Sequence, residues 1–136
     1  MATSRPTSIV LALILSASTG LAAAGELKLT GAQEVPPNTS TAVGTGAIAV
    51  AADGAVSGSV AAPGMAGMAA HIHVGAAGVN GPVIIPLTGG PGDTWTVPPG
   101  AKLNAEQMQS YKAGKLYVNI HTAEHKGGEI RAQLTP

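Results

Sequence analysis

The segment TGAIAVAADGAVSGSVAA, residues 45–62, decides the fold class of this chain. It consists of two runs of small and β-branched residues, which are separated by the pair Asp53-Gly54. An Asp-Gly pair between two such runs is a strong signal for a two-residue turn, because Asp and Gly tolerate the backbone conformation that this turn requires. The segment therefore predicts a β-hairpin.

The same pattern continues on both sides of the hairpin. Short apolar runs alternate with turns rich in Gly, Pro and Asn, which is typical of antiparallel sandwiches and barrels. One stretch, residues 104–114 (NAEQMQSYKAG), has helical features, since Asn104 and Gln107 are placed to form a capping box and Gly114 suits the position after the helix. We predict an all-β, antiparallel, Greek-key-like sandwich or barrel with one short helix. Further strands are expected at residues 26–31, 69–74, 83–87, 116–121 and 129–134.

Residues 1–24 have the composition of an export signal peptide. Arg5 supplies the positive charge, residues 9–15 (IVLALIL) the apolar centre, and residues 22–24 (AAA) the small side chains that precede a cleavage site. The apolar run is too short to span a bilayer as a permanent helix, and an uncleaved anchor is the alternative. We expect an exported protein, periplasmic or secreted, with a single domain over residues 25–136 and no stable membrane span after the signal is removed.

The composition argues against several functions. The chain has no cysteine, so neither a disulfide framework nor a thiolate ligand is available. Its seven basic and seven acidic residues cancel and form no basic run, so we expect no nucleic-acid partner. With one Trp, two Tyr and no Phe, the chain has little aromatic surface for stacking on sugars or bases. No serine-nucleophile motif and no pair of carboxylates stand out.

All four histidines of the chain lie in two short segments. In residues 71–74 (HIHV), strand alternation places His71 and His73 on one face and Ile72 on the other. In residues 115–125 (KLYVNIHTAEH), the same alternation places His121 opposite the apolar side chains, and His125 follows in the loop. If the two strands lie near each other, the histidines converge on the face that does not form the core. The expected core-facing side chains are those of Ile72, Val74, Leu116, Val118, Ile120, Ile130, Ala132 and Leu134.

Converging imidazoles are a common way to hold a transition metal. Two residues on the same face of a strand are about 7 Å apart, so both can reach one ion. The Irving–Williams order favours copper at a site made of nitrogen ligands. We therefore predict one metal ion, copper before zinc, with His71, His73 and His121 as the core ligands and His125 as the fourth. In the alternative interpretation, the histidines hydrogen-bond to their neighbours on a solvated sheet face and hold no metal.

Other side chains near the histidines are expected to play supporting roles. Met65 and Met68 are interpreted as gap-fillers in the packing, with thioether ligation of Cu(I) as the alternative. Glu34, Glu124 and Glu129 are expected at the surface or in turns. Because Glu124 lies between two histidines in the sequence, it is also a candidate hydrogen-bond partner for an imidazole.

Three longer segments resemble a known family. Residues 29–50 (LTGAQEVPPNTSTAVGTGAIAV), 69–87 (AAHIHVGAAGVNGPVIIPL) and 103–134 (LNAEQMQSYKAGKLYVNIHTAEHKGGEIRAQL) are similar to the CHRD domain, the module named after chordin. The resemblance covers nearly all of residues 25–136 and implies an extracytoplasmic β-sandwich or barrel. In animals, it implies part of an antagonist of signalling ligands, whereas the stand-alone bacterial versions have no established activity.

A second, weaker similarity concerns the histidines. A pair of histidines on one strand, followed by a distant histidine, resembles the copper site of Cu/Zn superoxide dismutases, which are β-sandwiches. This chain lacks their disulfide cysteines and a recognisable zinc loop, because Asp93 is the only carboxylate between the histidine pair and the predicted helix. The similarity therefore supports a single metal site better than dismutase turnover.

Three functions remain open from the sequence. The leading hypothesis is a non-enzymatic, exported domain that binds one transition-metal ion. The alternative from another class is a metal-free module that binds a protein or a component of the cell envelope. A copper-dependent redox or dismutase-like enzyme is the third.

Overall fold

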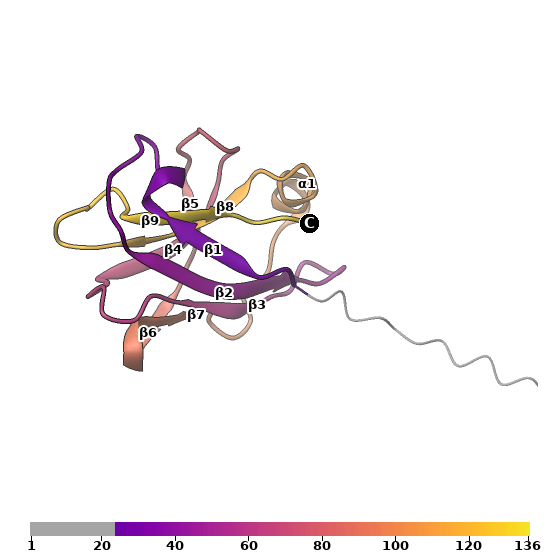
Figure 1. Ribbon diagram of the computed structural model, residues 1–136. Coiled ribbons are helices and arrows are strands. Elements are labelled where there is room, and N and C mark those ends of the chain that lie inside the picture. The colour runs from indigo at the N-terminus through magenta and orange to yellow at the C-terminus, as the bar shows by residue number, and fades with distance from the viewer. Residues whose placement is uncertain (1–23) are drawn as a thin grey trace, which may run out of the picture.

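The computed structural model describes residues 24–136, which form one antiparallel sheet with a single α-helix (Figure 1). The prediction of an all-β fold with one short helix is confirmed, while residues 1–23 of the predicted signal lie outside the described part. The helices are α1 (Ala105–Lys112) and the short 3-10 helices η1 (Gly31–Gln33) and η2 (Pro91–Asp93). The strands are β1 (Leu27–Thr30), β2 (Val43–Val50), β3 (Val56–Ala61), β4 (Ala69–Val74), β5 (Val83–Pro86), β6 (Thr88–Gly90), β7 (Thr94–Thr96), β8 (Leu116–His121) and β9 (Ile130–Gln133).

The sheet curls on itself into an almost closed barrel. Its strand order is β5-β4-β8-β9-β1-β2-β3-β7-β6, so β5 and β6 form the two edges. These edge strands follow each other in the chain and are separated only by Leu87. The N–H of Leu87 donates to the carbonyl oxygen of Ala70 in β4 at 2.9 Å. One short segment, residues 83–90, therefore connects both edges of the sheet.

The hairpin predicted around Asp53-Gly54 is formed by β2 and β3. Its turn is closed by the N–H of Gly54, which donates to the carbonyl oxygen of Ala51 at 2.9 Å. The central residues of this turn are therefore Ala52 and Asp53, one position earlier than the sequence predicts. Gly54 follows with a φ of +91°, a conformation that favours glycine. The Asp-Gly pair marks the turn correctly but not its register.

Strands β6 and β7 were not predicted from the sequence. Each has only three residues, and the segment between them is rich in Gly and Pro. A tertiary contact holds them together, since a Cβ on Gly89 would lie 2.9 Å from the indole of Trp95, its partner in β7. Only glycine lets the backbone approach the indole this closely, and periodicity cannot reveal such a contact.

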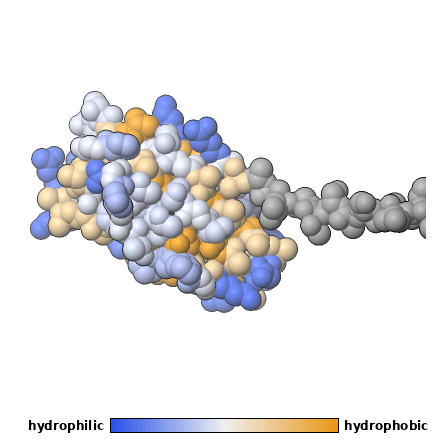
Figure 2. All heavy atoms as spheres, turned by 90° about the horizontal axis from the view of Figure 1, so that it is seen from below, coloured by the Kyte–Doolittle hydropathy of each residue, from blue (hydrophilic) through white to orange (hydrophobic). Residues whose placement is uncertain are grey.

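The apolar faces predicted by strand alternation form the core of the barrel. Ile72, Val118 and Ile120 are buried together with the apolar residues of β1, β3 and β9, whereas Val74 is only half-buried. Only 10% of the residues of the chain are charged. The face seen in Figure 2 is accordingly pale over most of its area, with strongly hydrophilic residues gathered at its rim. In the described residues, no helix is both long and apolar enough to cross a membrane.

Replacing Asn104 with alanine should lower the free energy of unfolding by about 1 kcal/mol. Asn104 Oδ1 accepts from the N–H of Gln107 at 2.8 Å, and the Gln107 side chain accepts from the N–H of Asn104 at 2.9 Å, so the predicted capping box is present. Urea unfolding measures the change, with the exposed Gln109→Ala in the same helix as the control. Equal stability of the two variants would show that the cap contributes nothing.

Candidate metal centre

The two histidine segments meet because β4 and β8 are neighbouring antiparallel strands. In their register, His71 pairs with Asn119, His73 with Tyr117, and Ala69 with His121. One ring nitrogen of each of His71, His73 and His121 lies within 4.8 Å of the corresponding atoms of the other two. The convergence expected from strand alternation is therefore present for these three residues, which we call the three-histidine cluster.

His71 and His121 make the closest contact of the cluster. The Nδ1 atom of His71 is 3.1 Å from the Nε2 atom of His121. Two nitrogen ligands on one ion, each bonded at 2.0–2.1 Å, are about 2.9–3.4 Å apart for angles between 90° and the tetrahedral angle. The observed separation lies within this range.

The tautomer of His121 is set by its backbone neighbour. Its Nδ1 atom is 2.9 Å from the carbonyl oxygen of Lys126, which accepts only, so Nδ1 carries the hydrogen. In neutral His121 the lone pair is therefore on Nε2, the atom that faces His71. A hydrogen bond of this kind orients a histidine for metal ligation.

His73 is held more tightly than the other two histidines. It is only 7% exposed, its Nδ1 is 2.9 Å from the Gly81 carbonyl oxygen, and its Nε2 is 2.9 Å from Asn119 Oδ1. Both oxygens are acceptors, and a neutral imidazole has one N–H, so neutral His73 donates to only one of them. Coordination through His73 Nε2 thus requires this atom to separate from the Asn119 side chain and the hydrogen to sit on Nδ1.

The environment keeps His71 and His73 neutral. Burial lowers the pKa of His71 from its ordinary value of 6.5, and the neighbouring His121 and His73 lower it further. Burial is also the main reason why the pKa of His73 is lowered, although its hydrogen bonds to Gly81 and Asn119 act in the opposite direction. Neutral imidazole is the form that a metal ion requires.

The histidine-bearing face is a second, polar interior. Tyr117, Asn119 and Arg131 on this face are all buried, so the interpretation as a solvated sheet face is wrong for most of it. The ring of Tyr117 stacks on His73 with 4.6 Å between ring centroids, and the guanidinium carbon of Arg131 lies 3.4 Å from the centroid of Tyr117. Because β8 lies between β4 and β9, Tyr117 separates the imidazole from the guanidinium. Residues 76–80 cover this stack, with the carbonyl oxygens of Ala76 and Val79 accepting from Arg131.

Two glutamates that were expected at the surface or in turns are buried. Glu34 is 4% exposed, and its Oε1 atom has no hydrogen-bond partner. Burial raises the pKa of Glu34, while the Asn119 side chain and Arg131 partly counteract the shift. Glu129 is 8% exposed and accepts hydrogen bonds from two hydroxyl groups. No signal in the sequence marks either residue as buried, whereas Glu124 is exposed as expected.

The remaining candidates lie apart from the three-histidine cluster. His125 groups instead with Glu124 and Glu129, and its Nε2 atom is 3.8 Å from Glu129 Oε1. Met65 is partly buried against the core, in agreement with its interpretation as a gap-filler. Met68 is exposed and fills no gap.

The fold and the site define a small antiparallel β-barrel domain that carries three clustered histidines on the polar side of its sheet. The family model of the CHRD domain matches residues 26–134, and the chain belongs to the CHRD family. This confirms the resemblance seen in the sequence. Among curated proteins and among solved structures, no match to the chain is found.

Proposed function

We propose that this protein is an exported, non-enzymatic CHRD domain that binds one transition-metal ion, copper before zinc, through His71, His73 and His121. The observation that supports the proposal is the convergence of three ring nitrogens within 4.8 Å, with the closest pair 3.1 Å apart. His125, the fourth ligand of the sequence-based hypothesis, groups with two carboxylates and is not assigned to this site.

The chemistry of the cluster favours copper. All three ligands are imidazoles, which suit Cu(II) and Zn(II), and the Irving–Williams order gives Cu(II) the higher affinity. The lowered pKa values of His71 and His73 remove proton competition near neutral pH. His71 and His121 form the closest pair of the site, and His73 completes it once its Nε2 atom leaves Asn119.

Metal analysis and calorimetry of the exported protein test this proposal. We expect one equivalent of Cu(II) to bind at the three-histidine cluster near neutral pH, and the substitution His71→Ala/His73→Ala to abolish this binding. Absence of stoichiometric Cu(II) and Zn(II) binding at this cluster would refute the proposal and favour the module that binds a protein or envelope component.

A copper-dependent redox enzyme is the second candidate. Three protein ligands leave a coordination position open to water or a small molecule, which is a feature of catalytic metal sites. Superoxide and oxidase assays of the copper-loaded protein separate this candidate from the leading one, because a binding protein will show no turnover above free copper.

The affinity for Cu(II) should decrease at acidic pH. The part of the decrease that is due to protonation of His71 and His73 should begin only below pH 6.5. Because burial lowers the pKa of His71 and His73 below 6.5, protons compete with the metal at these two residues only below that value. Competition titrations with a chelator at several pH values measure the effect. If His71 and His73 already bind protons at pH 7 in nuclear magnetic resonance spectra, this prediction is wrong.

We expect the exported protein to begin at or near Gly25. The small residues 22–24 end the signal pattern and precede the CHRD domain. Mass spectrometry of protein from the exported fraction determines the first residue. Retention of Met1 or Ala2 would show that the signal is not cleaved.

A further inference from the structure

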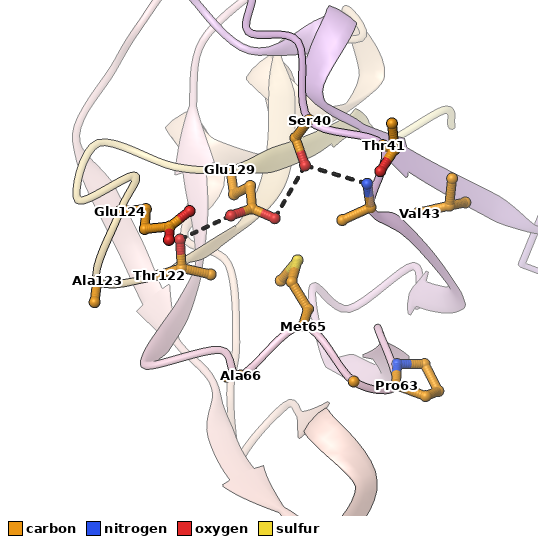
Figure 3. Close-up of a pocket in the computed structure, with 12 residues that line it drawn as sticks. Ser40, Thr41, Val43, Pro63, Met65, Ala66, Thr122, Ala123, Glu124 and Glu129 are labelled. Atoms are coloured by element: carbon orange, nitrogen blue, oxygen red, sulfur yellow. Dashed lines mark hydrogen bonds between the residues drawn. The ribbon is translucent and has the colours of Figure 1, made fainter.

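The loop between β8 and β9, residues 122–129, carries a second group of ligand atoms. Glu124, His125 and Glu129 each offer one atom, and these atoms lie within 4.8 Å of one another. None of the three belongs to the three-histidine cluster. Figure 3 shows the carboxylates of Glu124 and Glu129 turned toward each other at the wall of a cavity of about 510 Å³.

The carboxylate of Glu129 is oriented before any ligand arrives. Thr122 Oγ1 donates to its Oε1 atom at 2.9 Å, and Ser40 Oγ donates to its Oε2 atom at 3.0 Å (Figure 3). Each carboxylate oxygen has two lone pairs, so both oxygens can still bind a cation. The hydroxyl groups fix the direction of the carboxylate, but they do not neutralise its charge.

The backbone of the loop is also fixed. Thr122 Oγ1 accepts from the N–H of His125 at 3.2 Å, and the carbonyl oxygen of His125 accepts from the N–H groups of Thr122 and Gly128 at 3.3 and 3.0 Å. These bonds hold His125 over the start of β9, where Glu129 precedes Ile130. The backbone of His125 is therefore fixed beside the buried carboxylate, with its Nε2 atom 3.8 Å from Glu129 Oε1.

A third carboxyl group, that of Glu34, lies on the other side of the loop. Glu34 lines a cavity of about 320 Å³ together with Glu124 and His125. Glu34 is more than nine-tenths buried, and its Oε1 atom is unpartnered. Lys126 is the only basic side chain among the described residues that line this cavity. Glu34 thus lines the cavity on the other side of this loop, and its buried Oε1 atom forms no hydrogen bond.

We propose that Glu124, His125 and Glu129 form a second cation site, separate from the three-histidine cluster, for a divalent metal ion that accepts mixed nitrogen and oxygen ligands. Zn²⁺ binds imidazole nitrogen and carboxylate oxygen at about 2.0–2.2 Å, so Zn²⁺ is the ion that we assign to this site. His125 Nε2 and Glu129 Oε1 are 3.8 Å apart, so the two atoms must approach each other by a few tenths of an ångström to share one such ion. Glu124 is exposed, and its ligand atom lies within 4.8 Å of those of His125 and Glu129.

Zinc calorimetry on the exported protein tests this site. We expect two equivalents of Zn²⁺ in the unmodified protein, one at each site, and one equivalent in Glu124→Gln and in His125→Ala, where the affinity of the second site falls by at least about tenfold. The double variant His71→Ala/His121→Ala should still bind one equivalent of Zn²⁺ at the second site, which is the equivalent that Glu124→Gln loses. Glu106→Gln, on the exposed side of α1, is the matched control and should keep both.

The outcomes separate this site from the three-histidine cluster. If Glu124→Gln and His125→Ala bind Zn²⁺ with the stoichiometry and affinity of the unmodified protein, the second site does not exist. If the unmodified protein binds one equivalent that Glu124→Gln abolishes and His71→Ala/His121→Ala retains, the second site is supported and zinc binding at the three-histidine cluster is refuted. Circular dichroism of each variant confirms that a loss of zinc is not a loss of fold.

Discussion

Replacing His121 with alanine should weaken Cu(II) binding to the three-histidine cluster by at least about a hundredfold. Even the hydrogen-bond partners of metal ligands change affinity by about 10–100-fold when they are removed, and His121 is proposed as a ligand itself. Its Nε2 atom lies 3.1 Å from His71 Nδ1, and the Lys126 carbonyl oxygen fixes the tautomer in which this atom carries the lone pair. His71→Ala should have an effect of the same size, because the two residues form the closest pair.

A competition titration against a copper chelator of known affinity measures this loss. His125→Ala is the control, since His125 lies with Glu124 and Glu129, and it should change the tightest Cu(II) binding step by less than about tenfold. Electron paramagnetic resonance of the bound Cu(II) should show fewer nitrogen ligands in His121→Ala. If His121→Ala binds copper as tightly as the unmodified protein, the site is not formed by this residue.

Replacing Ile120 with alanine should lower the free energy of unfolding by about 2–5 kcal/mol, as for other buried large-to-small changes. Ile120 has no exposed surface and lies in the core between its neighbours on β4 and β9. The core contains a single Trp and otherwise consists of Val, Ile, Leu and Ala, and a protein core relaxes only partly into the cavity that such a truncation leaves. Such a change is a large fraction of the stability of a small domain.

Urea unfolding of the metal-free protein measures this effect without a contribution from the metal site. Val43→Ala is the matched control, because Val43 lies on a strand of the same sheet but is 46% exposed, and its cost should stay below about 1 kcal/mol. If Ile120→Ala also lowers the free energy of unfolding by less than about 1 kcal/mol, Ile120 does not face the core.

Local sequence signals predicted most of the fold. Strand alternation identified the buried faces of β4, β8 and β9, and the bounds predicted for β4 and β8 agree with the structure. The capping box at Asn104 placed the start of α1. These features depend on residues that are close in sequence, where periodicity and capping chemistry act. Strands β6 and β7 were missed because their pairing depends on the contact between Gly89 and Trp95.

The site was only partly predictable for the same reason. Alternation brought His71, His73 and His121 to one face, since it needs only the strand positions. The burial of Glu34 and Arg131 depends on loops that fold over that face from distant parts of the chain, and no periodic pattern encodes their path. The direction of the His121 lone pair depends on one loop carbonyl, that of Lys126. His125 was assigned to the nearest histidines in sequence, while the turn of its loop carries it to Glu129.

The two edge strands also bear on how this protein behaves when it is concentrated. An unpaired strand edge is a template for sheet growth between molecules, which leads to aggregation. Here β5 and β6 have only four and three residues, β5 ends in Pro86, which has no N–H to donate, and β6 ends in two glycines. Both edges therefore offer short and interrupted rows of hydrogen-bonding groups. Residues 83–90, which connect both edges of the sheet, thus also discourage strand pairing between molecules. Extending β5 or β6 with β-branched residues would make such pairing easier.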